Sequence, residues 1–188
     1  MKRLFPTLPD APDLSDVFKT FPEGAADILR LSDTIMCDEA AVHQGDRELI
    51  AAYVSALNAC QFCTGSHMNA AEAFGVDPGL LTELLIDVET ASVNDALKPL
   101  LRYVEKLTQT PARMTEQDAQ AVFAAGWSEA ALYDAVKVCA LFNFMNRIVE
   151  GTGVNADTSA GKPVTEAEKK ARRVRRYSDW GRSEGLME

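Results

Sequence analysis

Two cysteines and a histidine lie close together in residues 58–67, Asn-Ala-Cys-Gln-Phe-Cys-Thr-Gly-Ser-His. This stretch places Cys60, Cys63 and His67 at the spacing C-x-x-C-x-x-x-H. On an α-helix each residue turns by about 100°, so the three side chains would share one face, and Cys63 and His67 would meet as an i,i+4 pair. A thiol beside a base and one turn from a second thiol is the arrangement that a redox-active cysteine pair needs.

The sequence also indicates where this helix begins. Asn58 is a good N-cap residue, and Gln61 three positions later completes a pattern like a capping box. This start would place Cys60 in the first turn, where the backbone amides and the helix dipole favour a thiolate. The C-x-x-C spacing alone is weak evidence, because metal sites use it too. The histidine one turn further on favours the redox interpretation.

A carboxylate, Glu48, lies upstream of the cysteine pair in residues 46–58. The apolar residues of this stretch follow a helical period: Leu49, Ile50, Tyr53, Val54 and Leu57. If this helix ends near Asn58 and the chain turns back, Glu48 and His67 both lie about 14–15 Å from the turn, because a helix rises roughly 1.5 Å per residue. Glu48 would then orient His67, and His67 would deprotonate Cys63 directly or through a water.

The pattern E-x11-C-x-x-C-x3-H formed by these four residues resembles the signature of the alkylhydroperoxidase AhpD-like, carboxymuconolactone decarboxylase superfamily. Within it the chain is most similar to the branch of peroxidase-related proteins. The resemblance covers residues 15–155 and includes residues 140–148, which are similar to a second helical segment of that branch. One position departs, because better-studied members carry a second histidine just before the second cysteine, where this chain has Phe62. Any role of that histidine in proton transfer does not carry over.

The resemblance implies a cysteine-based hydroperoxidase, a peroxidase-type oxidoreductase. Cys63 is then the peroxidatic residue, whose thiolate attacks the O–O bond of a hydroperoxide and becomes a sulfenic acid. Cys60 condenses with it to a disulfide, which a dithiol or protein thiol reduces by exchange. Glu48 and His67 supply the base, and no metal, flavin, haem or other cofactor is needed. Members of the family are generally oligomeric, so we expect a homo-oligomer, a hexamer or trimer in preference to a dimer.

Three other functions remain open. The pair could serve as a dithiol–disulfide adapter for a partner peroxidase. A zinc-stabilised helical interaction module would add Cys37, His43 or Glu48 as a fourth ligand, although three ligands one turn apart surround a tetrahedral metal poorly. A lactone decarboxylase is disfavoured, because that branch typically lacks the cysteine pair. A c-type haem attachment is excluded, because Thr64 rather than histidine follows Cys63.

Composition narrows the class of protein. The 188 residues suit one domain with a substantial core, and the net charge of −9 disfavours nucleic acid or an anionic membrane as partner of the whole chain. No stretch reaches the roughly 18 apolar residues that span a bilayer, and residues 1–10 lack an apolar segment of signal-peptide length. We therefore expect a cytoplasmic protein, in which thiols stay reduced and a C-x-x-C pair is catalytic or metal-binding.

Helical periodicity and capping signals predict an all-α, AhpD-like bundle of about eight helices in a single domain over residues 1–188. Residues 1–13 form an extended lead-in, 14–154 the helical core and 155–188 a linker with a basic C-terminal helix. The helical segments are expected at 14–21, 23–37, 46–58, 60–75, a short stretch after Pro78, 94–109, 115–126, 129–150 and 165–177. The helix over 129–150 is apolar on nearly all sides, which is typical of burial in a core or a subunit contact.

Several residues outside the motif need an interpretation. Six cations in residues 169–176 form either a solvated face that packs on the protein or on an acidic neighbour, or a site for a polyanion. Cys37 and Cys139 lie on apolar stretches and are expected to be ordinary buried residues. Asn143 and Asn146 need hydrogen-bond partners in so apolar a helix, and capping bonds, interface bonds or a substrate would supply them.

Overall fold

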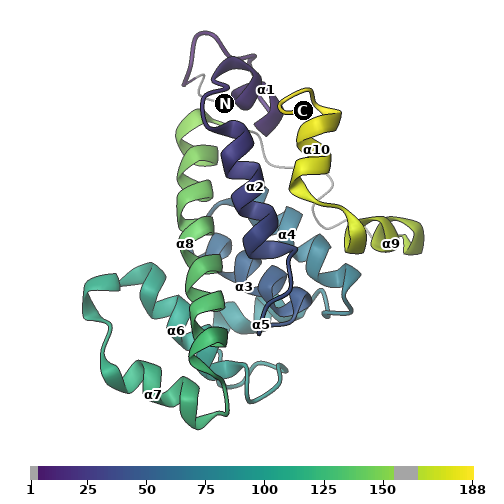
Figure 1. The fold of residues 1–188 in the computed structure, drawn as a ribbon. Coiled ribbons are helices and arrows are strands. Elements are labelled where there is room, and N and C mark those ends of the chain that lie inside the picture. Colours follow the sequence, from purple (N-terminus) through teal and green to yellow (C-terminus); the bar gives the residue numbers. More distant parts are fainter. Residues whose placement is uncertain (1–3, 155–164) are drawn as a thin grey trace.

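The computed structural model describes residues 4–154 and 165–188, and within these ranges the chain is helical throughout, without strands (Figure 1). The all-α prediction is confirmed, but these ranges hold ten α-helices where the sequence predicted about eight. The predicted linker at 155–163 lies outside the described residues. The helices are α1 (Leu14–Thr20), α2 (Ala25–Met36), α3 (Gln44–Leu57), α4 (Gln61–Ala73), α5 (Leu80–Ile86), α6 (Lys98–Gln109), α7 (Glu116–Ala124), α8 (Glu129–Thr152), α9 (Glu166–Val174) and α10 (Tyr177–Ser183), with a 3-10 turn at Pro111–Arg113.

Two antiparallel helices, α3 and α4, form the centre of the molecule, and the long α8 packs along α3 (Figure 1). The predicted return of the chain after the first of these helices is therefore present. Gly45 near the start of α3 allows the far ends of the pair to approach, because a Cβ there would lie 2.7 Å from Cβ of Phe74 at the end of α4. The close approach fixes how α3 and α4 align along their length.

Local capping explains several helix boundaries. The Thr115 amide donates to the Asp118 carboxylate (2.7 Å) at the start of α7, and the Ser128 hydroxyl accepts the Ala131 amide (3.2 Å) at the start of α8. Both helices therefore begin close to the predicted starts at 115 and 129. The helix predicted from residue 94 begins later, at Lys98, because the Asn94 side chain accepts the Ala96 amide (3.0 Å) and holds the chain in a turn.

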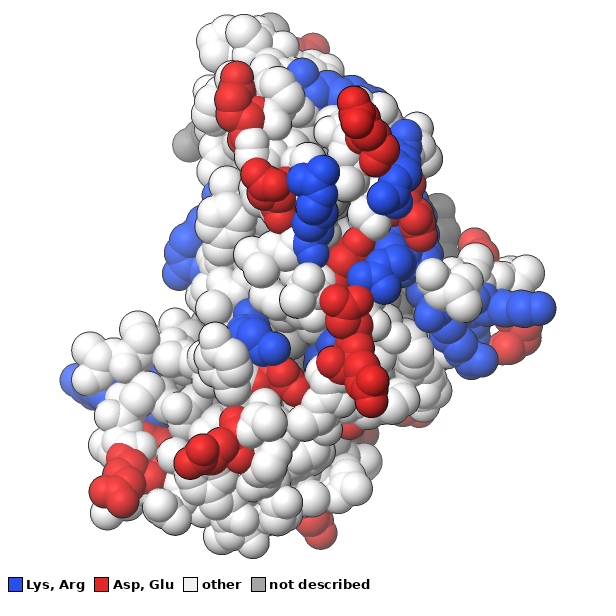
Figure 2. Space-filling model, in the orientation of Figure 1, with Lys and Arg blue, Asp and Glu red and all other residues white. Residues whose placement is uncertain are grey.

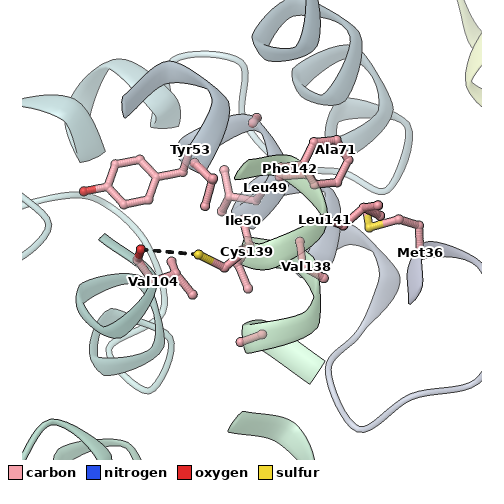
Figure 3. Close-up of a cluster of buried hydrophobic side chains, with 14 of the residues drawn as sticks. Met36, Leu49, Ile50, Tyr53, Ala71, Val104, Val138, Cys139, Leu141 and Phe142 are labelled. Atoms are coloured by element: carbon pink, nitrogen blue, oxygen red, sulfur yellow. Dashed lines mark hydrogen bonds between the residues drawn. The ribbon is translucent and has the colours of Figure 1, made fainter. Parts of the chain in front are cut away.

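The hydrophobic core lies where α3, α4, α6 and α8 meet (Figure 3). Its fully buried side chains include Leu49, Ile50 and Tyr53 of α3, packed against the apolar residues of α8. Burying a side chain of this size contributes about 1.5–3 kcal/mol relative to leaving it in water. Cys139 belongs to this core as predicted, and its thiol donates to the Val104 carbonyl (3.7 Å).

The C-terminal segment folds back over the helices that carry the motif. Helix α9 packs on α4, and α10 packs on α2 (Figure 1). The predicted single helix over 165–177 is wrong, because the chain leaves the helical conformation at Arg175 and starts α10 at Tyr177. Asp33 of α2 causes this break, since its carboxylate accepts the Tyr177 amide (2.6 Å) and the Ser178 amide (3.3 Å). A residue distant in sequence thus caps α10.

None of the described helices is both long and apolar enough to cross a lipid bilayer.

The cap from Asp33 gives a prediction about stability. Asp33→Ala should lower the free energy of unfolding by about 1–2 kcal/mol, the usual cost of losing a helix cap, and should expose the α10 amides. Urea unfolding and hydrogen exchange of residues 176–183 measure the two effects. Asp27→Ala is the matched control, because Asp27 is an exposed carboxylate of the same helix that pairs with Arg30. Equal effects of the two substitutions would contradict the capping role.

Candidate active site

The turn between α3 and α4 sets the positions of the two cysteines. Asn58 ends α3, Ala59 adopts a left-handed conformation with φ of 56°, and Cys60 is the N-cap of α4. The prediction that Asn58 caps the cysteine helix is therefore wrong, because its amide group points to α8, where it donates to the Asn146 side-chain oxygen (2.9 Å). Cys63 lies in the first turn of α4, where free backbone amides favour an anion.

Glu48 and His67 lie opposite each other on α3 and α4. The Oε2 atom of Glu48 is 2.6 Å from Nδ1 of His67, and both side chains are buried. The contact predicted between these residues is present. A carboxylate at Nδ1 holds the proton on that nitrogen and leaves Nε2 as the basic atom. The ring of Phe142 on α8 meets the imidazole edge-on at 4.2 Å between ring centres, and so restricts its orientation.

The two thiols differ in protonation. Both are free and buried, with exposed fractions of 0% for Cys60 and 4% for Cys63. A hydrogen bond from the Cys60 thiol lowers the pKa of Cys63 to about 7 against the effect of burial, and a positive charge on His67 lowers it further. The same hydrogen bond, together with burial, raises the pKa of Cys60 well above that of a free thiol. The site thus favours a thiolate at Cys63 and a neutral thiol at Cys60.

An amide network from α8 supports the thiolate, and the sequence did not identify it. The Asn146 side chain makes a hydrogen bond that lowers the pKa of Cys63, and its nitrogen also donates to the Ser55 hydroxyl (3.0 Å). Asn143 donates to the Thr108 hydroxyl (3.2 Å). The need for partners in the apolar helix was the only sequence signal, and it did not distinguish Asn146 at the thiol from Asn143 beside it.

Glu150 is a second group that sequence reasoning did not identify. Its carboxylate accepts a hydrogen bond from Cys60 and thereby raises the pKa of that thiol, and its charge also opposes a thiolate at Cys63. Because the side chain of Glu150 is exposed, it connects the buried Cys60 thiol to the surface. No local pattern marks this residue, which lies ninety positions after Cys60 and reaches it only through the packing of α8 on the α3–α4 turn.

A cavity of about 410 Å³ opens beside the site. Cys63, His67 and Glu48 line it, whereas Cys60 lies behind Cys63 in a small apolar cluster with Val149 of α8. The residue at the position of the family's second histidine, Phe62, also lines the cavity.

The C-terminal segment contributes one wall of this cavity, through side chains such as Tyr177 and Trp180. Burial is the main cause that raises the pKa of Tyr177, and the nearby negative charge of Glu48 raises this pKa further. The hydroxyl of Tyr177 therefore stays protonated beside the thiols. No sequence pattern indicated that this segment reaches the site. The first of the two interpretations of its cations, packing on the protein, holds for Arg173, which donates to the Ala73 carbonyl at the end of α4.

Cys37 and His43, which the sequence offered as a fourth zinc ligand, have other positions and contacts in the structure. Cys37 is only half-buried and lines the cavity, so it is not the ordinary core residue that was predicted. The pKa of Cys37 is raised to about 11, mainly by burial and further by the negative charges of Asp33 and Glu48, so Cys37 stays a neutral thiol. His43 caps α3 by accepting the Gly45 amide (3.1 Å). Within residues 4–154 and 165–188, no three His, Cys, Asp or Glu side chains are grouped to hold a metal ion.

Comparison with known proteins shows one similar family and two similar structures. The model of the carboxymuconolactone decarboxylase family matches residues 22–106, which include all four motif residues. An uncharacterized peroxidase-related protein from Silicibacter sp. TM1040 is 22% identical, with a TM-score of 0.72 over 79% of this chain and 78% of that one.

A second structure, the alkylhydroperoxidase AhpD core of an uncharacterized peroxidase-related protein from Ralstonia eutropha JMP134, is 19% identical, with a TM-score of 0.71 over 76% of this chain and 75% of that one. No curated protein sequence matches. The chain is thus similar to the carboxymuconolactone decarboxylase family over residues 22–106, and it shares its fold with both structures.

Proposed function

We propose that this protein is a thiol-dependent hydroperoxidase that uses the Cys60–Cys63 pair. The observation that carries the proposal is the asymmetry of the pair: Cys63 lines the cavity and has a lowered pKa, whereas Cys60 lies behind it with a raised pKa. A peroxidatic residue must be a thiolate that the substrate can reach, and a resolving residue needs only to reach the first sulfur. The names of the two similar structures support a peroxidase-related role.

The proposed reaction begins with attack of the Cys63 thiolate on one oxygen of the O–O bond. The bond breaks, Cys63 becomes a sulfenic acid, and the alkoxide leaves with the other oxygen and takes a proton from the imidazolium of His67. The Cys60 sulfur then attacks the Cys63 sulfur, the S–O bond breaks, and hydroxide leaves as water with the proton of Cys60. Two electrons pass from the thiols to the peroxide, and an external dithiol restores both thiols by exchange.

Glu48 has a positioning role in this scheme. Its carboxylate, 2.6 Å from Nδ1 of His67, stabilises the imidazolium that donates the proton and aims Nε2 away from α3. Because the pair is buried, its charges interact in a medium of low polarity, where the interaction is stronger than in water. The arrangement needs no metal or organic cofactor for the steps described.

A dithiol–disulfide adapter would use the same residues, but the burial of the pair favours the hydroperoxidase. A partner protein would have to bring a disulfide to Cys63, a residue that is only 4% exposed, whereas a small hydroperoxide can enter the cavity. The observation that separates the two functions is therefore the access to Cys63. Rates of oxidation by an organic hydroperoxide and by an oxidised protein would compare them directly.

We also propose that the protein is a homo-oligomer, a hexamer or trimer. The outer face of α8 carries a stripe at helical spacing in which Tyr133 is 64% and Phe144 45% exposed, with Ala140 between them and Lys137 over the Tyr133 ring. Leu31 on the adjacent α2 is also exposed, at 52%. Large apolar side chains gathered on one face mark an interaction surface, and this stripe fits a contact between copies of the chain.

The roles of the cysteines can be tested by substitution. Cys63→Ser should abolish dithiol-dependent hydroperoxide consumption, because it removes the reachable thiolate. Cys60→Ser should leave a sulfenic acid on Cys63 that a dimedone-type probe labels, as read by intact and peptide mass spectrometry. Cys37→Ser is the control, since this neutral thiol lines the same cavity, and it should retain turnover. Labelling of Cys60 in Cys63→Ser would reverse the assignment.

The lowered pKa predicts a pH profile. Because the pKa of Cys63 falls from 9.0 to about 7, its alkylation by iodoacetamide should rise with pH and reach half its maximum near pH 7. Asn146→Ala removes a hydrogen bond to the charged form, so the midpoint should move upward by about one pH unit. Asn143→Ala is the matched control, because its amide bonds to Thr108 instead. A midpoint equal in both variants would refute the role of Asn146.

The oligomer has its own test. Light scattering at micromolar concentration should give a mass of several chains for the wild type and a lower mass for Tyr133→Asp/Phe144→Asp, because charges at a buried contact are costly. Val174→Asp is the control, since Val174 is exposed on α9 away from α8. A monomeric wild type would contradict the proposal.

A further inference from the structure

The cavity beside Cys63 is far larger than the smallest hydroperoxide. Its volume is about 410 Å³, whereas a molecule the size of water takes up about 30 Å³ of liquid. Hydrogen peroxide would occupy only a small part of this space. A ligand of roughly a dozen non-hydrogen atoms fits it, within the size range of small-molecule sites. The space therefore suits a hydroperoxide with a substantial organic body.

Apolar side chains from four helices form most of the cavity wall. They come from α1, α2, α8 and α10, and they are Phe18, Ile28, Leu29, Phe142, Met145 and Trp180. A flexible hydrocarbon chain bound here would leave water along most of its length, and each methylene group adds to the binding. The body of the ligand is thus best matched by an aliphatic chain.

The acidic side chains at the cavity are already engaged within the protein. Asp13 accepts the Asp16 amide (2.9 Å) at the start of α1, and Glu48 binds His67. Glu184 pairs with Lys19 at 2.7 Å. Glu48 and Glu184 therefore have basic partners, and backbone amides at the start of α1 hold the negative charge of Asp13.

The basic side chains at the cavity come from the C-terminal segment, and they are not all engaged. Figure 2 shows Lys and Arg side chains gathered over α9 at the side of the molecule. Arg176 is engaged, because its guanidinium binds Asp38 at 2.6 Å. Arg172 lies near enough to Glu168 to lower the pKa of that exposed carboxyl. Arg175 forms no side-chain hydrogen bond or ion pair with any part of the chain that the structure describes, and both Arg172 and Arg175 line the cavity.

We propose that the cavity binds amphipathic hydroperoxides that carry a carboxylate, of the class of medium-chain fatty acid hydroperoxides. Arg172 and Arg175 bind the carboxylate, the apolar wall holds the chain, and the peroxide group lies at Cys63. Guanidinium groups are well suited to this task, because their planar donors match the two oxygens of a carboxylate. The proposal rests on the proposed function, since Cys63 must cleave the O–O bond and leave the hydroxy acid as product.

The test compares a medium-chain hydroperoxy fatty acid with its methyl ester, which differs only in the charged group. With dithiothreitol as reductant, kcat/KM of the wild type should be higher for the acid. Arg172→Gln/Arg175→Gln should lower kcat/KM for the acid about tenfold, mainly through KM, and leave the ester within about twofold. Added salt should reduce the preference for the acid, because it screens exposed charges.

A matched control is Lys170→Gln, which removes a cation of α9 that does not line the cavity. It should leave the ratio of acid to ester unchanged. Equal kcat/KM for acid and ester in the wild type would overturn the inference. So would a double variant that changes the ratio no more than Lys170→Gln does.

Binding without turnover separates this inference from the proposed function. Trp180 lines the cavity, so its fluorescence should respond to decanoate more strongly than to methyl decanoate, and Trp180→Phe should remove the response. Loss of the decanoate response in Arg172→Gln/Arg175→Gln supports the carboxylate site, whether or not the protein consumes hydroperoxide. A protein that consumes no hydroperoxide would overturn the proposed function alone. Turnover without any carboxylate dependence in either assay would overturn the carboxylate site alone.

Discussion

The contact between Glu48 and His67 is the interaction on which the site depends. Burying a carboxylate and an imidazole removes both from water, and the attraction between them does little more than offset that loss. The pair therefore adds little to the stability of the fold, and its position beside a thiol fits a role in the chemistry of the site. Its geometry follows from the backbone, because the turn at Ala59 and the close approach at Gly45 align α3 with α4 at both ends.

Helix α8 completes the site from the other side. It supplies Phe142 against the imidazole, Asn146 at the Cys63 sulfur and Glu150 at the Cys60 sulfur. Each acts on a different group, so a shift of α8 along α3 would disturb the base, the thiolate and the thiol together. The hydrogen bonds of Asn58 and Ser55 to Asn146 oppose such a shift, because they tie the end of α3 to α8. In a buried network of this kind every polar group needs its partner.

The sequence predicted the part of the site that local geometry determines. Helical period and a short turn were enough to bring Glu48 to His67, because both lie at similar distances from that turn. They were not enough for Asn58, whose side chain favours an N-cap in isolation but donates to Asn143 and Asn146 of α8 in the fold. Asp33 is a similar case, since it caps α10 from 144 residues away. Asn146, Tyr177 and Arg175 reach the site only through packing of distant helices, which leaves no periodic signal near the cysteines.

The net charge of the chain would repel an anionic ligand, whereas the cations at the cavity attract it. The charges nearest to the ligand have the larger effect. A net charge of −9 would repel an anion, but screening in physiological salt limits the reach of exposed charges to about 8 Å. At the cavity the acids are engaged with Lys19, with His67 and with the start of α1, whereas Arg175 is not engaged by any described residue. The field that a ligand meets at the cavity is therefore set by α9 and its C-terminal end. Acidity elsewhere on the surface acts on solubility and encounter, and leaves the selectivity of the cavity to its own residues.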